Sequence, residues 1–158
     1  MTRATKNSKA RPALRCTVVV LDAGRRKVLP GVERLVRKAA RAAARRGKSL
    51  NVALADDQAV RVLNKRDRKK DKPTNVLSYP SGERAFLGDI VLARQTVWRE
   101  AKRQNKSPAD HVAHLVVHGV LHLLGHDHEI ADADAERMEA LERRILKRLG
   151  IADPYLAR

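Results

Sequence analysis

The stretch HGVLHLLGHDH, residues 118–128, holds four of the six histidines in this 158-residue chain. Imidazole nitrogens are among the ligands that zinc prefers, so a cluster of histidines first suggests a metal site. His118 and His122 are four residues apart, and on a helix this spacing puts them on one face, one turn from each other. Two buried imidazoles so close would repel each other when protonated, whereas one small cation can bind both. The pair therefore predicts a metal centre.

A third ligand must come from beyond this pair, and Gly125 provides a way to supply it. Glycine readily adopts the left-handed conformation that ends a helix, so the chain can turn back at this point. Either His126 or His128 could then reach the same cation, and the spacing alone does not choose between them. Three neutral imidazoles suit zinc and leave a fourth position for water or substrate, which is typical of catalytic zinc sites.

His111 and His114 precede the pair on the same predicted helix. His111 lies two turns before His118, about 10 Å by helical rise, which is too far for a shared metal ion. For His111 and His114 we expect hydrogen-bonded core histidines, or residues that orient the metal ligands.

The cluster also matches the histidine and glycine positions of the metzincin protease pattern, H-E-x-x-H-x-x-G-x-x-H. Gly119, however, stands where those enzymes carry the glutamate that serves as general base. Peptide hydrolysis by that mechanism needs a carboxylate beside the metal-activated water. A metzincin-like protease is therefore a poor fit to this sequence.

The hydrophobic pattern predicts the elements that must position these histidines. Short β-branched runs predict strands, and apolar residues repeated every three or four positions predict helices. We expect strands at 16–21, 50–55, 75–80 and 85–93, and helices at 30–47, 56–63, 94–104, 107–124 and 132–149. Ser107 and Pro108 are a suitable N-cap and first residue for the histidine-bearing helix. The polar segment 64–74, with six basic and two acidic residues, is expected to be a loop.

This order of elements predicts one α/β (α+β) domain with a small mixed β-sheet and about five helices. The length is that of a single ordinary domain. Residues 1–15 are expected to be a flexible basic tail, and residues 16–158 the domain. The single cysteine, Cys16, excludes an internal disulfide framework and is expected to be a buried thiol rather than a nucleophile.

The charge of the chain is its strongest compositional signal. Lysine and arginine total 34 against 18 aspartate and glutamate residues, which gives a formal net charge of +16 and a pI near 10.9. Such a field attracts polyanions, and nucleic acid is favoured over a membrane surface because no strongly apolar amphipathic anchor accompanies the charge. No apolar stretch approaches the roughly 20 residues that span a bilayer, and no signal-peptide core follows the basic start. A cytoplasmic protein with no membrane partner is the simplest interpretation, whereas an organelle transit peptide has little support.

Three stretches occur in order: LNKRDRKKDKPTNVLSYP (63–80), LGDIVLA (87–93) and HLVVHGVLHLLGHDH (114–128). Together they resemble the YbeY family of single-strand-specific metallo-endoribonucleases and rRNA maturation factors. The family signature resembles H-G-x-L-H-L-x-G-Y-D-H, and this chain meets it everywhere except at His126, where tyrosine is usual. The basic N-terminal extension lies outside the resemblance.

The resemblance implies that the zinc ligands are His118, His122 and His128, with one Zn²⁺ per chain. It also implies that Arg68 lies across a cleft from the metal and is important for activity. The implied fold packs the histidine-bearing helix centrally against the mixed sheet. The implied function is cleavage of single-stranded RNA, chiefly maturation of the 16S rRNA 3′ end and quality control of ribosomes. The implied partners are rRNA, the small ribosomal subunit and its assembly factors.

Other residues have expected roles within this framework. The guanidinium of Arg68 would present a fixed fork of donors to the scissile phosphate. Lys70 and Lys72 would hold the flanking RNA backbone without reading its sequence. Three residues are expected to orient the ligand histidines or to move protons: Asp89, His114 and Asp127.

Two other functions stay open at this point. The zinc could staple the fold of a non-catalytic ribosome assembly factor, which would explain why no general base is evident. A metal-dependent peptidase is a less favoured alternative. Water on zinc and the 2′-hydroxyl of the RNA are both possible nucleophiles, and the sequence does not choose between them.

Overall fold

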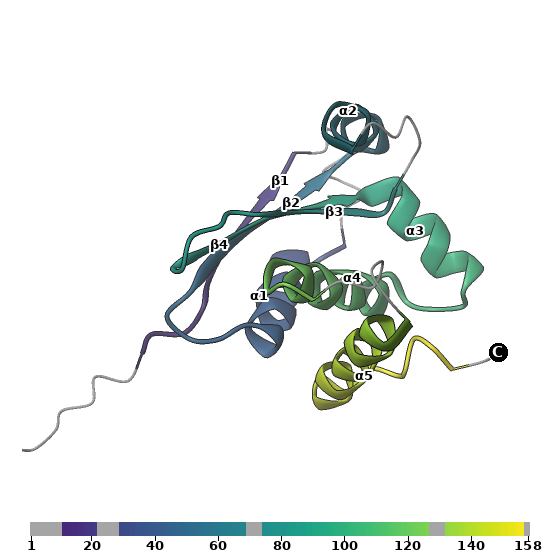
Figure 1. The fold of residues 1–158 in the computed structure, drawn as a ribbon. Helices are drawn as coiled ribbons and strands as arrows, with labels where there is room; N and C mark the ends of the chain where they lie inside the picture. The colour runs from purple at the N-terminus through teal and green to yellow at the C-terminus, as the bar shows by residue number, and fades with distance from the viewer. Residues whose placement is uncertain (1–10, 22–28, 69–73, 127–131, 157–158) are drawn as a thin grey trace, which may run out of the picture.

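The computed structural model describes residues 11–21, 29–68, 74–126 and 132–156. In these residues the chain forms four strands and five helices (Figure 1). The strands are β1 (Arg15–Val20), β2 (Ser49–Ala55), β3 (Val76–Pro80) and β4 (Phe86–Ala93). The helices are α1 (Val32–Ala43), α2 (Asp57–Arg68), α3 (Arg94–Arg103), α4 (Pro108–Leu123) and α5 (Asp132–Arg148). The mixed sheet with five helices that the sequence predicts is thereby confirmed.

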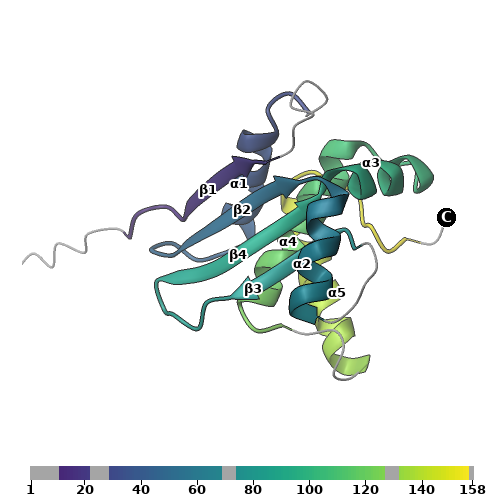
Figure 2. The same cartoon turned by 90° about the horizontal axis from the view of Figure 1, so that it is seen from above.

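The four strands form one sheet in the order β1-β2-β4-β3. β1 pairs parallel with β2, β2 pairs parallel with β4, and β3 pairs antiparallel with β4. Parallel neighbours need crossover connections, whereas the antiparallel β3 and β4 can follow each other directly along the chain. Viewed from above, α2 crosses one face of the sheet and β3 lies at its edge (Figure 2).

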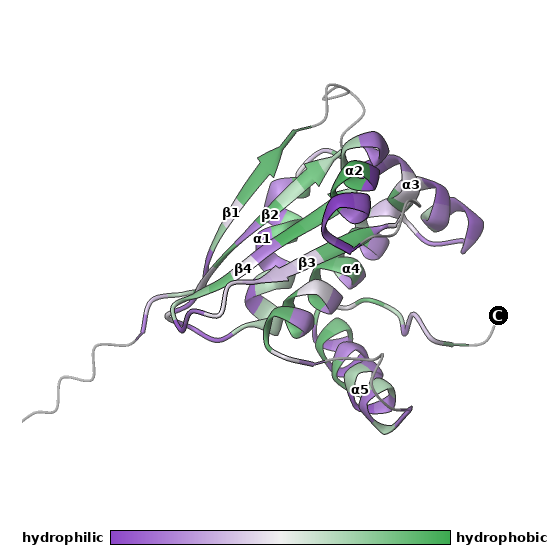
Figure 3. Cartoon of the chain, turned by 45° about the horizontal axis from the view of Figure 1, so that its top comes forward, coloured by the Kyte–Doolittle hydropathy of each residue, from purple (hydrophilic) through white to green (hydrophobic). Residues whose placement is uncertain are grey.

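Helices cover both faces of the sheet, with α2 on one face and α1, α4 and α5 on the other (Figure 1). The main core lies on the second face, where strand and helix residues that are at most 1% exposed meet. It includes Val36, Val52, Leu54, Ile90, Leu92, Val116, Val120, Met138 and Leu146. A smaller cluster beneath α2 contains Val60, Leu77 and Ala93. Figure 3 shows a corresponding pattern, with green predominating along β1 and β2 and purple along α3.

Helix α4 is the central element of the main core. Ser107 caps its first turn by accepting a hydrogen bond from the Asp110 N–H at 3.1 Å, and Pro108 starts the helix. The helix packs against β3, β4, α1, α3 and α5. Gly119 permits its close approach to the sheet, since a Cβ there would lie only 3.0 Å from Ile90 Cδ1. Polar side chains on a helix so enclosed need hydrogen-bond partners inside the protein, because a buried polar group without one costs free energy.

Two helices end elsewhere than the sequence pattern indicates. The prediction that residues 64–74 form a loop is wrong for its first part, because α2 continues to Arg68. Asn64 is only 3% exposed, and the Tyr79 hydroxyl donates to Asp67 Oδ2 at 2.9 Å, so tertiary contacts hold the last turn of α2 on β3. Helix α1 is shorter than residues 30–47, because the chain must return to start β2 at Ser49.

The N-terminal segment packs on the domain earlier than the predicted boundary at residue 16. Leu14 is 2% exposed within the main core, and the Gly47 N–H donates to the Pro12 carbonyl at 2.8 Å. The part of the predicted tail in residues 1–10 lies outside the described residues. Cys16 is buried, as expected, and burial raises the pKa of its thiol, an effect that Arg37 and Arg41 oppose.

Candidate metal centre

The predicted histidine pair lies on the C-terminal half of α4. The Nε2 atoms of His118 and His122 are 3.0 Å apart, and the two rings stand nearly perpendicular with centroids 4.6 Å apart. Two imidazole ligands of one tetrahedral zinc, each at about 2.0–2.1 Å, would have nitrogens about 3.3 Å apart. The two Nε2 atoms therefore already converge nearly as two ligands of one small cation would.

A buried carboxylate holds the pair from the side. Glu142 on α5 is fully buried, and its Oε1 lies within hydrogen-bond distance of His118 Nδ1. Its Oε2 lies 3.1 Å from His114 Nε2, one turn earlier on α4, and accepts a hydrogen bond from the Tyr155 hydroxyl. One carboxylate thus bridges two histidines of α4 and the segment that follows α5.

The protonation states follow from these contacts. Burial alone would raise the pKa of Glu142, but the hydrogen bonds from His114, His118 and Tyr155 outweigh it and lower the pKa to about 2. The ionised carboxylate can only accept hydrogen bonds, so His118 must carry its proton on Nδ1. The lone pair of His118 then lies on Nε2, the atom that faces His122. A carboxylate that fixes a ligand histidine in this way is a common feature of zinc sites.

Tyr155 and His114, both partly buried, complete this polar group around Glu142. Burial, followed by the hydrogen bond to Glu142, raises the pKa of Tyr155 well above its ordinary value, so its hydroxyl stays a donor. Its ring packs edge-on against the His114 ring, with centroids 5.6 Å apart. Burial lowers the pKa of His114, an effect that Glu142 opposes. A neutral His114 with its proton on Nε2 fits this arrangement and the orienting role predicted for it.

The end of α4 has the turn that the sequence predicts at Gly125. Gly125 has φ 98°, its N–H donates to the His122 carbonyl, and the His126 N–H donates to the Leu121 carbonyl, each at 3.0 Å. These two bonds form a Schellman motif, which needs the left-handed conformation that glycine adopts most easily. The motif directs the chain away from the helix axis just before residue 127.

The third predicted ligand is His128. His128 and Asp127 lie outside the described residues. Among the residues that are described, no group of three or more histidine, cysteine, aspartate or glutamate side chains is arranged to hold a metal ion. The two converging imidazoles fit a zinc ion as part of a ligand set, and the third member stays a prediction.

Arg68 ends helix α2 beside the edge strand β3. Its Nη2 donates to the Ser78 carbonyl at 2.7 Å, and its guanidinium carbon lies 5.9 Å from the centre of the Tyr79 ring. The Ser78 hydroxyl in turn points to the carbonyl of Gly119, the residue after His118, at a distance of 3.5 Å. Ser78 therefore connects the arginine to the turn of α4 that carries the histidines. Arginine has five N–H donors, so most stay available for a phosphate.

The structure does not bring Asp89 to the histidines. Asp89 is exposed and accepts a hydrogen bond from Asn51 Nδ2 at 3.0 Å. Its neighbour Ile90 packs on α4 beneath Gly119, and successive residues of a strand face opposite sides of the sheet. Asp89 thus faces the side away from the metal centre, which corrects its expected role. Lys70 and Lys72 lie outside the described residues.

His111 belongs to a separate buried group, as its distance from His118 predicts. Its Nε2 lies 3.1 Å from Glu100 Oε2, which also accepts from Asn75 Nδ2 at 3.1 Å. This group ties the residue before β3, helix α3 and the start of α4 together.

Glu142 is the functional residue that the sequence interpretation missed. A signal was present, because Glu142 falls four residues after Met138 and three before Ile145, on the apolar face of its own helix. A carboxylate among core positions must have partners in the interior. The histidines of the predicted α4 helix are chemically suited to be those partners.

Comparison with known proteins shows the family to which the chain belongs. The family whose sequence profile matches residues 23–150 is described as Endoribonuclease YbeY. An Endoribonuclease YbeY of Azorhizobium caulinodans is 55% identical over 115 residues, which cover 69% of this chain and 72% of that protein. One of Parvibaculum lavamentivorans is 56% identical over 120 residues, which cover 67% of this chain and 64% of that protein.

A solved structure supports the fold. The solution structure of TM1509 from Thermotoga maritima matches with a TM-score of 0.55 at 23% identity, over 90% of this chain and 99% of that one. The family profile and the curated relatives define the class of protein, a nuclease that acts on RNA. The chain belongs to the YbeY family of endoribonucleases.

None of the described helices is both long enough and apolar enough to cross a membrane.

Proposed function

We propose that this protein is a zinc-dependent endoribonuclease that cuts single-stranded RNA. The observation that carries the proposal is the pair of Nε2 atoms 3.0 Å apart on His118 and His122, with Glu142 behind His118. The resemblance to the family supplies the third ligand, His128. When bound, the ion would polarise a phosphoryl oxygen and activate a water molecule.

The protein's own side chains would do the rest. Glu142 keeps His118 in the tautomer whose Nε2 can bind a cation. Arg68, held at the edge of the sheet by Ser78 and Tyr79, keeps N–H donors for the scissile phosphate and for the charge that develops on it. Lys70 and Lys72 would contact flanking phosphates. The net charge of +16 supports binding to RNA without base recognition.

In the cell we assign the activity to ribosome biogenesis. The substrate would be rRNA, with maturation of the 16S rRNA 3′ end and quality control of ribosomes as the processes served. The small ribosomal subunit and its assembly factors would be the partners, and the cytoplasm the location. These assignments rest on the family resemblance and on the basic surface that RNA binding needs.

One observation favours a second candidate, a non-catalytic assembly factor with a zinc-stapled fold. Glu142 accepts three hydrogen bonds and has its pKa lowered to about 2 despite its burial, so it does not act as a base at neutral pH. A peptidase is disfavoured further by the packing of Gly119, where a Cβ would already contact Ile90 at 3.0 Å. The glutamate of a metzincin does not fit at that position.

The decisive experiment compares cleavage of a fluorescent single-stranded RNA oligomer by four purified proteins. The wild type should cut it with about one zinc per chain, and a chelator should stop the reaction. His118→Ala should lose both zinc and cleavage. Arg68→Glu should keep zinc and the melting temperature while cleavage falls at least a hundredfold, which is the scale for removing one transition-state donor.

Arg66→Glu is the matched control for the arginine. It makes the same change of charge two residues earlier, but the Arg66 side chain pairs with Asp67 instead of the edge of the sheet. The nuclease proposal fails if zinc-loaded wild-type protein leaves the RNA intact. The role of Arg68 fails if Arg68→Glu cuts the RNA as fast as Arg66→Glu does. Intact rRNA processing in cells that carry Arg68→Glu would favour the assembly factor.

A further inference from the structure

A pocket of about 550 Å³ lies just past the end of α4, between residues Gly125–His126 and one face of α5. Its lining on α5 consists of Asp134, Arg137, Ala140, Leu141 and Arg144. The volume falls within the range of about 300–1,000 Å³ that is usual for small-molecule sites. His118 and His122 do not line the pocket, although His126 is only four residues beyond His122. The pocket therefore adjoins the metal centre without being part of it.

The walls of the pocket are built on rigid elements. On one side, the Schellman hydrogen bond from the His126 N–H to the Leu121 carbonyl fixes the backbone of His126. On the other side, positions 137, 141 and 144 share one face of α5, because they are spaced by four and three residues. Helix α5 is itself anchored in the core by Met138, Ile145 and Leu146. The backbone that carries the lining side chains is thus fixed before a ligand binds.

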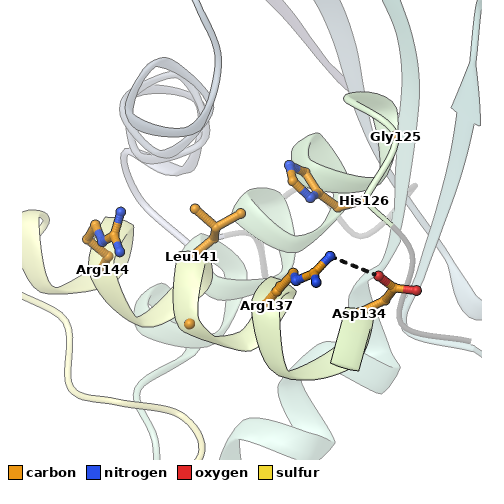
Figure 4. Close-up of a pocket in the computed structure, with 7 residues that line it drawn as sticks. Gly125, His126, Asp134, Arg137, Leu141 and Arg144 are labelled. Atoms are coloured by element: carbon orange, nitrogen blue, oxygen red, sulfur yellow. Dashed lines mark ion pairs between the residues drawn. The ribbon is translucent and has the colours of Figure 1, made fainter. Parts of the chain in front are cut away.

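The chemistry of the lining is an apolar floor with a cationic rim. Figure 4 shows Leu141 between Arg137 and Arg144, with the His126 ring across from them. Arg137 pairs with Asp134 at 3.6 Å, but its side chain is 78% exposed, so this pair is weak and is readily exchanged for another anion. Arg144 is exposed and forms no ion pair with the described residues. Two guanidinium groups thus flank a surface that suits a flat, weakly polar ring.

We propose that this pocket binds one nucleotide of the single-stranded RNA substrate, next to the phosphodiester that is cut. The base would pack against the His126 ring and the Leu141 side chain, since unstacked bases in RNA commonly stack on such side chains. The phosphates on the two sides of this base would bind Arg137 and Arg144, whose planar groups match phosphate oxygens. The inference rests on the proposed function and adds a substrate subsite to it.

Two features favour RNA over an acidic protein partner. An acidic peptide would use the arginines but has no use for the imidazole and the apolar floor. Gly125 and His126, in the turn that ends the histidine-bearing helix, also line the pocket, so an RNA strand bound at the metal centre would extend toward it. RNA duplex is disfavoured, because its bases are stacked inside and cannot enter a pocket.

The test measures the affinity of a fluorescein-labelled single-stranded RNA oligomer by anisotropy. Arg144→Ala should raise its Kd about tenfold, equivalent to the loss of one good ionic contact, and Arg144→Glu should raise it further. The log–log slope of affinity against salt should fall by about one unit. Arg148→Ala is the matched control, since it removes the same charge one turn further along α5 at a position outside the pocket. Its effect on Kd should be less than twofold, within the range of unspecific charge loss.

A second pair of variants tests base stacking. His126→Ala should weaken binding of the oligomer, and His126→Phe should restore it, because phenylalanine keeps a flat ring without the imidazole nitrogens. An oligomer with an abasic site at the bound position should bind wild type and His126→Ala alike. All variants should keep the zinc content and melting temperature of the wild type, which separates a lost contact from a lost fold.

The inference is overturned if Arg144→Ala and Arg148→Ala bind RNA equally well. It is also overturned if a polyglutamate peptide binds the wild type but not Arg144→Glu while RNA affinity stays unchanged, because the pocket then belongs to an acidic protein partner. In both cases cleavage of RNA by the wild type would leave the proposed function standing. Failure of the wild type to cut RNA, with normal zinc loading, would instead refute the proposed function.

Discussion

Replacing Glu142 by glutamine should weaken zinc binding without creating a cavity in the core, because the two side chains have nearly the same shape. The carboxylate receives two donors at Oε2, from His114 and Tyr155, and one at Oε1, from His118. A glutamine whose side-chain oxygen keeps the two hydrogen bonds that Oε2 accepts, from His114 and Tyr155, must turn its NH₂ group toward His118 Nδ1. Two donors cannot face each other, so His118 would move its proton to Nε2.

The size of the effect follows from that tautomer. The Nε2 atom that faces His122 would now carry a proton, and a metal ion would have to displace it. Loss of a partner that orients a ligand histidine typically lowers metal affinity about 10- to 100-fold, or about 1.4–2.8 kcal/mol. The metal-free protein should also lose about 1–3 kcal/mol of unfolding free energy, because a charge-assisted hydrogen bond inside the core is replaced by a weaker one.

The assay is a zinc competition titration against a chromophoric chelator, with the histidine tautomers of the metal-free protein read from ¹⁵N chemical shifts. Glu139→Gln is the control, since it neutralises a carboxylate on the same helix that is 39% exposed and pairs with Arg143 at 3.8 Å. The control should bind zinc like the wild type. Equal zinc affinity in Glu142→Gln and Glu139→Gln, with His118 still protonated on Nδ1, would refute the reasoning.

Three further predictions concern stability. The hydrogen bonds to Glu142 outweigh its burial and lower its pKa from 4.5 to about 2. The unfolding free energy of the wild type should therefore fall as the pH is lowered from 4.5 to about 2, and this loss should be smaller in Glu142→Gln. Gly119→Ala should lower the melting temperature, since overpacking against Ile90, at about 1–3 kcal/mol, exceeds the helix propensity gained, at about 1 kcal/mol. Gly125→Ala should cost about 1–2 kcal/mol in denaturant unfolding, from backbone conformation alone, because its Cβ would meet nothing within 4 Å. A melting temperature of Gly119→Ala above that of the wild type would contradict the close packing of α4 on Ile90. Wild-type stability of Gly125→Ala would contradict the left-handed turn at the end of α4.

The local pattern of the sequence was sufficient for much of this protein. Short β-branched runs and helical periodicity predict the four strands and five helices of the described residues, because these patterns reflect burial of each element whatever its neighbours are. The spacing of His118 and His122 is also a local property, since any α-helix puts residues four apart on one side. Gly125 is equally local, because the Schellman turn involves only the last turn of α4.

Tertiary structure alone decided which other residues join the histidines. Glu142 reaches His118 across 24 positions and Tyr155 reaches His114 across 41, through the packing of α5 and the segment after it on α4. Asp89 has a suitable side chain, yet the pleat of β4 turns it to the opposite face of the sheet. Helix α2 passes its predicted end because contacts with β3 stabilise a last turn that its charged sequence would not maintain alone. Such contacts depend on which surfaces meet, and no short-range pattern along the chain contains that information.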